Sequence, residues 1–256
     1  MSKPSRGHYR QQRSRIAKIV VAKEDRIYTP ASVSTKSEEV MPICFKNNFI
    51  FFHIPRCSGT YFDTYYRFNE GNPLFGIKTI GNRKLTLPHL TYADVRIEGL
   101  LPLDILNSFF KFTIIRDPFP RMVSDYIWQK NHDLHGEFKH LSFMKYLDKG
   151  ERIMGERKYF EKIHYDHFRP MNEYCYWNGT RVMDEILVLE DIESELLRIK
   201  ERINLDRMPR MNSSSYNIDD FSTKEHIDRV YGLYAEDKNL HDALSNCSNE
   251  LEHRSR

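Results

Sequence analysis

Residues 48–60 have the sequence Asn-Phe-Ile-Phe-Phe-His-Ile-Pro-Arg-Cys-Ser-Gly-Thr, and the predicted fold is built outward from this stretch. Its apolar run, residues 49–52, is rich in aromatic and branched side chains and is typical of a strand covered on both faces. Pro55 ends the strand because it has no N–H group to donate, and Gly59 lets the backbone turn closely around a neighbouring group. The stretch therefore predicts a buried strand, a tight loop and the start of a helix.

The loop after this strand has the chemistry of an anion site. Ser58 or Thr60 can cap the helix that follows, and the start of a helix presents unpaired N–H groups and a partial positive charge. Arg56 adds a full charge and a planar fork of donors. These features indicate a phosphate or sulfate site, and an ordinary turn is the alternative.

Residues 111–126 repeat this arrangement with the sequence Lys-Phe-Thr-Ile-Ile-Arg-Asp-Pro-Phe-Pro-Arg-Met-Val-Ser-Asp-Tyr. A strand runs directly into a helix, for which Asp117 fits the N-cap and a proline the first position. Arg116 lies at the carboxyl end of the strand, where open α/β sheets bind ligands. Arg121 and Ser124 share one helix face, so they can converge on a single anion. Residues 48–60 and 111–126 thus each form a corner, a strand running into a helix with arginine and hydroxyl groups. Two such corners indicate a ligand with two separated anionic groups.

Together the two stretches resemble the carbohydrate-type (family 2) sulfotransferases, which use 3′-phosphoadenosine 5′-phosphosulfate (PAPS). Residues 53–60 resemble the family's 5′-phosphosulfate loop, usually His-Ile-Pro-Lys-x-x-Gly-Thr, and residues 116–126 resemble its 3′-phosphate motif, Arg-Asp-Pro-x-x-Arg-x-x-Ser-x-Tyr. The resemblance extends from about residue 48 to about residue 240. It implies a P-loop-NTPase-like layered α/β fold.

The resemblance also implies which residues bind PAPS: Arg56, Cys57, Ser58, Gly59, Thr60, Arg116, Arg121, Ser124, Arg210, Asn212 and Ser213. Residues 210–214 resemble the family's polar loop over the nucleotide. A serine-rich loop without a ligand is the alternative for that segment.

Two residues are predicted to act in catalysis. His89 lies in the sequence His-Leu-Thr-Tyr, and in the resembled family a histidine in a similar context is a candidate general base. Imidazole titrates near neutral pH and can take a proton from an attacking hydroxyl, although a structural role is the alternative for a single histidine. Arg56 and the loop N–H groups are predicted to stabilise charge on the leaving oxygen. No metal is expected, because arginine and backbone dipoles supply the positive potential.

The region between residues 131 and 180 is aromatic, basic, irregular and partly helical, and acceptor recognition is expected there. It contains a group of histidines: His132, His135, His140, His164 and His167. No carboxylate or cysteine completes a metal-binding set at firm spacing, so the sequence predicts a polar surface region rather than a metal site.

The expected reaction is in-line transfer of the sulfuryl group from PAPS to a hydroxyl of a glycan. Arg56 departs from the family, which has lysine there, and an arginine cannot readily give a proton to the leaving group. This departure leaves open a sulfotransferase-like protein that binds nucleotide or glycan without turnover. A small-molecule kinase on the same architecture is disfavoured, because the sequence Gly-x-x-x-x-Gly-Lys-[Ser/Thr] is missing.

The remaining pattern alternates strands with helices. Residues 185–189 indicate a third buried strand, and Asp191 is expected to cap the helix after it. Residues 69–88 are expected to form turns with one short strand, and residues 222–235 an amphipathic helix. The alternation predicts a mainly parallel sheet with helices on both faces, and right-handed crossovers place both motif loops at the same edge.

The chain has 256 residues and a net charge of +3, which is too small to indicate nucleic-acid binding. We expect a basic, flexible arm at residues 1–40, one sulfotransferase-like domain at 41–240 and a polar tail at 241–256. The arm either touches an acidic surface or is simply solvated. No apolar run approaches the roughly 18 residues of a membrane span, and no signal peptide is evident. With four scattered cysteines, a soluble cytoplasmic protein is expected.

Overall fold

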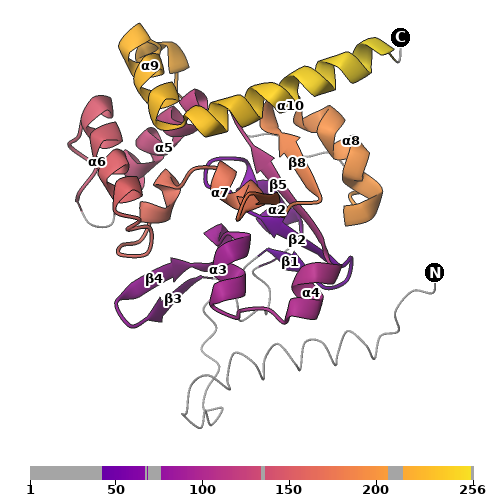
Figure 1. The fold of residues 1–256 in the computed structure, drawn as a ribbon. Helices are drawn as coiled ribbons and strands as arrows, with labels where there is room; N and C mark the ends of the chain where they lie inside the picture. Colours follow the sequence, from indigo (N-terminus) through magenta and orange to yellow (C-terminus); the bar gives the residue numbers. More distant parts are fainter. Residues whose placement is uncertain (1–41, 67, 69–75, 134–135, 207–215, 255–256) are drawn as a thin grey trace, which may run out of the picture.

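The computed structural model describes residues 42–66, 68, 76–133, 136–206 and 216–254 (Figure 1). Its central sheet has four strands in the order β1-β2-β5-β8. They are β1 (Ile43–Cys44), β2 (Phe49–Phe52), β5 (Phe110–Ile115) and β8 (Glu185–Val188). β2, β5 and β8 are parallel, and β1 pairs antiparallel with β2 at the edge. The predicted mainly parallel α/β sheet is confirmed.

The sheet is buried because its strands are apolar on both faces. Each residue of β2, and residues 112–115 of β5, is at most 1% exposed. Phe51 stacks on Phe112 across the two strands, with ring centroids 5.0 Å apart. Thr113 is polar, and its Oγ1 donates to the carbonyl of Phe52 at 2.7 Å, so its burial leaves no hydroxyl unpaired.

Helices flank the sheet and join its strands (Figure 1). The α-helices are α2 (Gly59–Tyr65), α3 (Tyr92–Ile97), α4 (Leu103–Ser108), α5 (Pro118–His132), α6 (Phe143–Gly155), α7 (Asn172–Cys175), α8 (Ile192–Ile203), α9 (Lys224–Leu233) and α10 (Ala235–Arg254). Shorter 3-10 turns are η1 (Leu87–His89), η2 (Tyr165–Phe168), η3 (Leu189–Asp191) and η4 (Ile218–Phe221). Two small hairpins pair β3 (Ile77–Ile80) with β4 (Arg83–Thr86), and β6 (Tyr176–Trp177) with β7 (Thr180–Arg181).

The register brings the carboxyl ends of the parallel strands to one edge. Phe52 of β2 pairs with Thr113 of β5, and Ile115 pairs with Val188 of β8. The segments that follow these strand ends are therefore neighbours. One direct link is the backbone N–H of Asp117, which donates to Glu190 Oε1 at 3.1 Å.

A second apolar cluster lies beside the sheet core and packs α5, α6 and α9 together. From α6 it takes Phe143, Tyr146, Leu147 and Ile153. This helix was not located from the sequence within the irregular region at 131–180. Its apolar residues fall on one face at helical spacing, and Ser142 caps its start by accepting from Lys145 N.

Three further expectations differ from the structure. Residues 69–88 contain two strands rather than one, because β3 turns back on β4 at Gly81, whose φ is +58°. Asp191 makes no side-chain cap to α8; it ends the turn η3, and its carbonyl accepts from Ser194 Oγ instead. Helix α10 continues across the predicted tail to Arg254. The domain division stays a prediction, and the arm at 1–40 lies outside the described residues.

Candidate active site

The loop between β2 and α2 has an uncommon backbone. Arg56 and Ser58 have φ values of 67° and 63°, a left-handed conformation that few residues other than glycine adopt. Ser58 occupies the N-cap position of α2, yet its side chain makes no capping bond. The N–H of Cys57 donates to the carbonyl of Ile54 at 3.2 Å and closes the turn. This conformation directs the Arg56 side chain away from the strand and toward α5.

His53 fills the space beneath this loop. Its ring stacks on Phe51, and a Cβ placed on Gly59 would lie 1.8 Å from His53 Nε2. Burial, reinforced by the charges of His89 and His167, holds the pKa of His53 well below its usual value. The ring is therefore neutral near pH 7, and Asp63, 3.5 Å from its Nδ1, does not form a charged pair with it. Because Gly59 has no side chain, the loop can pack directly on the His53 ring.

Gly59→Ala is expected to lower the free energy of unfolding by about 1–3 kcal/mol, because the added methyl must displace a buried ring. Gly155→Ala, at the end of α6, is the matched control, since a Cβ added there would have no atom within 4 Å. Urea unfolding of both variants measures the difference. Equal stability of Gly59→Ala and the unchanged protein would show that His53 does not press on the loop.

The second corner lies between β5 and α5. Asp117 caps α5 as predicted, with Oδ1 accepting from Phe119 N at 2.8 Å. Arg116, just before it, is half-buried. Within the described ranges its guanidinium makes no hydrogen bond or ion pair. It is therefore a cation at the edge formed by the carboxyl ends of the parallel strands, and no described residue takes its donors.

The Arg56 side chain links the first corner to the helix of the second. Arg56 donates from Nε and from Nη2 to Ser124 Oγ, at 3.1 and 3.0 Å, across 68 residues of sequence. Its guanidinium also lies 5.8 Å from the centre of the Trp128 ring. The Ser124 oxygen accepts both bonds, so its hydroxyl hydrogen is still available for an anion. The two predicted motifs thus converge in space.

Arg121 is turned inward. It is 1% exposed; its Nε donates to the carbonyl of Pro55 at 3.3 Å, and its Nη2 donates to those of His167 and Arg169 at 2.9 and 3.0 Å. The third nitrogen, Nη1, is buried without a hydrogen-bond partner. Most of the donors of Arg121 hold backbone segments together, so these contacts do not include an anion site. Its predicted role in binding PAPS stays a prediction.

The structure describes some of the other residues predicted to bind PAPS, but not all of them. Cys57 is buried with Sγ 3.9 Å from Met171 Sδ, and burial raises the pKa of its thiol to about 12. Its side chain is therefore a neutral packing group. Ser58, Gly59 and Thr60 lie at the start of α2 on the same loop as Arg56. Their binding roles stay predictions, and Arg210, Asn212 and Ser213 lie outside the described residues.

His89 is paired with a carboxylate that was not identified from the sequence. Its Nδ1 lies 2.8 Å from Asp166 Oδ2, on η2. Burial lowers the pKa of His89, and Asp166 opposes this only in part. Burial alone would raise the pKa of Asp166, but the charge and hydrogen bond of His89 bring it down to about 2. An ionised carboxylate only accepts, so Nδ1 carries the hydrogen and Nε2 is left as an acceptor.

A second histidine–carboxylate pair lies beside the first. His167 Nδ1 is 2.6 Å from Asp125 Oδ1, and the other oxygen of Asp125 accepts from the Tyr146 hydroxyl. Burial would raise the pKa of Asp125, but the charge of His167 and both hydrogen bonds outweigh it and lower the pKa. The His89 ring lies 5.0 Å from that of His167 and 5.0 Å from that of His53. The pairs therefore border the Arg56 loop.

A family model described as the sulfotransferase family matches residues 41–254. The chain belongs to this family, of the family 2 type. The match includes both corners and both histidine–carboxylate pairs. No curated protein and no solved structure gives a significant match. Within the described part of this sulfotransferase, no helix has the length and apolar character needed to cross a membrane.

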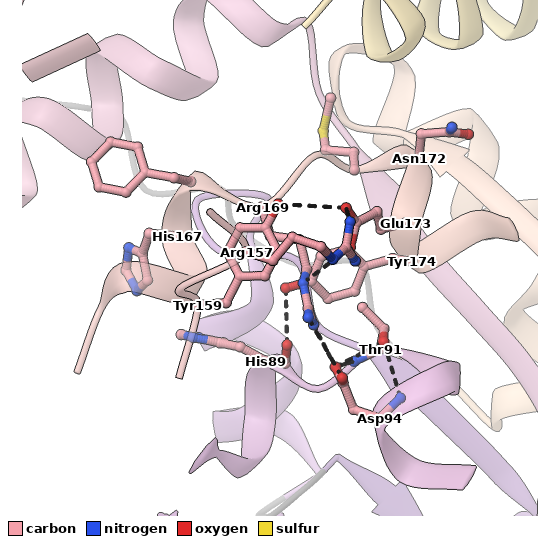
Figure 2. A network of polar contacts seen from close by, with 12 residues as sticks. His89, Thr91, Asp94, Arg157, Tyr159, His167, Arg169, Asn172, Glu173 and Tyr174 are labelled. Atoms are coloured by element: carbon pink, nitrogen blue, oxygen red, sulfur yellow. Dashed lines mark hydrogen bonds and ion pairs between the residues drawn. The ribbon is translucent and has the colours of Figure 1, made fainter. Parts of the chain in front are cut away.

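In this sulfotransferase a buried arginine, Arg169, makes its polar contacts beside His89 (Figure 2). Arg169 is 4% exposed and forms an ion pair with Asp94, which also completes a capping box with Thr91 at the start of α3. From the same segment as Arg169, the Tyr174 hydroxyl donates to the carbonyl of His89 at 2.9 Å. These contacts fix the segment that carries His89 against the segment that carries Asp166.

Sequence reasoning missed Asp166 and Asp125 as parts of the candidate site of this sulfotransferase. One signal was present for the first of them, because Asp166 stands between two of the histidines in His-Tyr-Asp-His, residues 164–167. The sequence analysis looked for a carboxylate at a fixed spacing from the histidines and found none. The fold brings His89 to Asp166 from 77 residues away.

Proposed function

We propose that this sulfotransferase uses PAPS as donor and transfers the sulfuryl group in line to a hydroxyl of a glycan. The observation that carries the proposal is the contact of Arg56 with Ser124, because it brings two loops of anion-binding composition into one site. The His89–Asp166 pair supports it further, since a base held by a carboxylate stands next to that site.

The residues present fit a nucleotide with anions at both ends. Arg116 has donors that no described residue uses, and it lies next to the Ser124-bearing helix, so these two side chains are assigned to the 3′-phosphate. Arg56 is assigned to the 5′ end. When bound there, PAPS supplies the sulfuryl group and a nucleotide leaving group.

The protein's own part in the reaction is proton removal and charge stabilisation. His89 Nε2 takes the proton of the acceptor hydroxyl while the hydroxyl oxygen forms its bond to sulfur. Asp166 stabilises the resulting imidazolium through Nδ1. Arg56 stabilises the negative charge that develops on the oxygen left on the nucleotide as the old sulfur–oxygen bond breaks. Arginine does this as a fixed cation, without donating a proton.

The glycan acceptor rests on the resemblance to carbohydrate-type enzymes. Trp128 and His164 support it, because both are half-buried aromatic side chains beside the His167 ring. Aromatic groups with one apolar and one polar side suit a sugar, which has both kinds of surface.

Calorimetric titration with adenosine 3′,5′-bisphosphate tests the donor site, with AMP as control and EDTA present. We expect binding that requires the 3′-phosphate and becomes about 10- to 100-fold weaker in Arg116→Ala, the loss of a charged hydrogen bond. Arg83→Ala is the matched control, because that exposed guanidinium, on β4, pairs with Glu98 instead.

Three outcomes would contradict the proposal. Failure to bind either nucleotide would mean that the loops are structural corners only. Specific binding without transfer to any glycan in a screen would favour the alternative function, a nucleotide- or glycan-binding protein without turnover. Magnesium-dependent use of ATP would favour a kinase.

A further inference from the structure

His89, Asp166 and His167 form a cluster whose donor atoms face one another. One donor atom from each lies within 4.8 Å of the other two. Asp166 and His167 are 2% and 4% exposed, yet Asp166 Oδ1 and His167 Nε2 have no hydrogen-bond partner. Buried polar atoms are rarely left unpaired, so these two indicate that the cluster binds something. His89, with 14% of its side chain exposed, leaves a way in from solvent.

We propose that these three side chains form a binding site for a divalent metal ion of the zinc class. Two imidazole nitrogens and one carboxylate oxygen are a donor set that zinc prefers, with water as the fourth ligand. This goes beyond the transfer reaction, for which no metal was expected from the sequence.

His167 is already arranged as a metal ligand. Its Nδ1 is held by Asp125, which is buried and also accepts from the Tyr146 hydroxyl. An ionised carboxylate at Nδ1 fixes the hydrogen there and leaves the lone pair of Nε2 directed at the cluster. This carboxylate–histidine arrangement is the usual outer support of a metal-bound imidazole.

His89 and Asp166 supply the other two ligands by giving up their shared hydrogen. His89 Nδ1 and Asp166 Oδ2 are 2.8 Å apart. Ligand atoms around tetrahedral zinc stand about 3.4 Å apart, so the pair has to open by about half an ångström. The ion takes the place of the hydrogen on Nδ1, and that hydrogen is replaced by one on Nε2. The imidazole stays neutral and only its tautomer changes.

The change of tautomer has a consequence for catalysis, which rests on the proposed function. A hydrogen on Nε2 removes the lone pair that accepts the proton of the hydroxyl. Metal binding and base action by His89 therefore exclude each other, and zinc is expected to inhibit transfer. The existence of the metal site does not depend on the identity of the reaction.

The test uses full-length, tag-free protein stripped of metal, titrated with Zn²⁺ by calorimetry and with Co²⁺ by visible absorption. We expect one saturable site with the intense absorption of tetrahedral Co²⁺. His167→Asn keeps a donor for Asp125 but lacks Nε2, and Asp166→Asn keeps size but removes the charge. Each is expected to weaken zinc binding by at least the roughly 100-fold that loss of a supporting partner can cause.

His164→Asn is the matched control. This histidine neighbours His167, with ring centroids 5.2 Å apart, but is outside the cluster, and asparagine tolerates its left-handed backbone. Zinc affinity is expected to be unchanged in this variant. Circular dichroism establishes that each variant is folded.

A measurement on the unchanged protein makes the test independent of folding of the variants. Nitrogen-15 NMR of the imidazoles is expected to show His89 with its hydrogen on Nδ1 before zinc and on Nε2 after it. Absence of saturable zinc and cobalt binding, or unchanged affinity in both ligand variants, would overturn the site. Failure of nucleotide binding would instead affect the proposed function alone.

Discussion

Replacement of Arg56 by alanine is expected to lower the turnover of sulfate transfer by about 10³-fold at saturating PAPS, the loss known for a donor aimed at developing charge. Arg56 joins the first loop to the helix of the second corner through its double donation to Ser124 Oγ. In the proposed mechanism the alanine variant lacks the guanidinium that stabilises the leaving oxygen. Transfer of radiolabelled sulfate to a glycan acceptor measures the loss.

Arg56→Lys is the matched variant, because lysine is the residue that the sulfotransferase loop usually carries. It keeps the charge but loses the planar fork that reaches Ser124. Activity close to that of the unchanged protein is expected, since an ammonium can both stabilise the oxygen and protonate it. If Arg56→Ala keeps its turnover within about threefold, charge stabilisation by this residue is not part of the mechanism.

Replacement of His89 by asparagine is expected to lower turnover between about 10²- and 10⁴-fold, the range for loss of a general base. The amide of asparagine keeps a donor near the position of Nδ1 for Asp166 but has nothing at the position of Nε2. The variant therefore separates the acceptor nitrogen from the packing of the residue. Rate measurements at saturating donor, over a series of acceptor concentrations, give the effect on turnover.

Nucleotide affinity provides the control for His89. We expect His89→Asn to bind adenosine 3′,5′-bisphosphate as the unchanged protein does, because no donor of the two corners is altered. Asp166→Asn is expected to lower turnover less than His89→Asn, since it only weakens the hold on Nδ1 and the stabilisation of the imidazolium. A His89→Asn variant with full turnover would assign proton removal to another group.

The sheet was predictable because its buried strands are short stretches of continuous apolar residues. The run at residues 49–52 is apolar throughout, which is typical of a short strand covered on both faces. The corners were predictable for a similar reason: Pro55 and the Asp117 cap act on their immediate neighbours. Helix α6 was not located, because its apolar face packs against α5, η2 and the distant α9, which the local sequence does not reveal.

The two strand-to-helix corners of the candidate site were predictable from the sequence. The side-chain contacts between distant segments were not. Spacing places Arg121 and Ser124 on one face of α5, but it does not say what covers that face. In the structure the cover is the segment 165–169, whose carbonyls take the donors of Arg121. The partner of His89 was hidden for the same reason, because a hydrogen bond across 77 residues leaves no local pattern.

Arg121 also determines what has to move together if this site is rebuilt in another protein. One guanidinium is bonded to Pro55 in the first loop, to His167 and Arg169 beside the base, and sits itself on the helix of the second corner. Grafting the first loop alone would leave a carbonyl without its donor, and grafting α5 alone would bury an unpaired cation, which is strongly destabilising. The first loop, the segment with His167 and Arg169, and α5 therefore have to be transferred together.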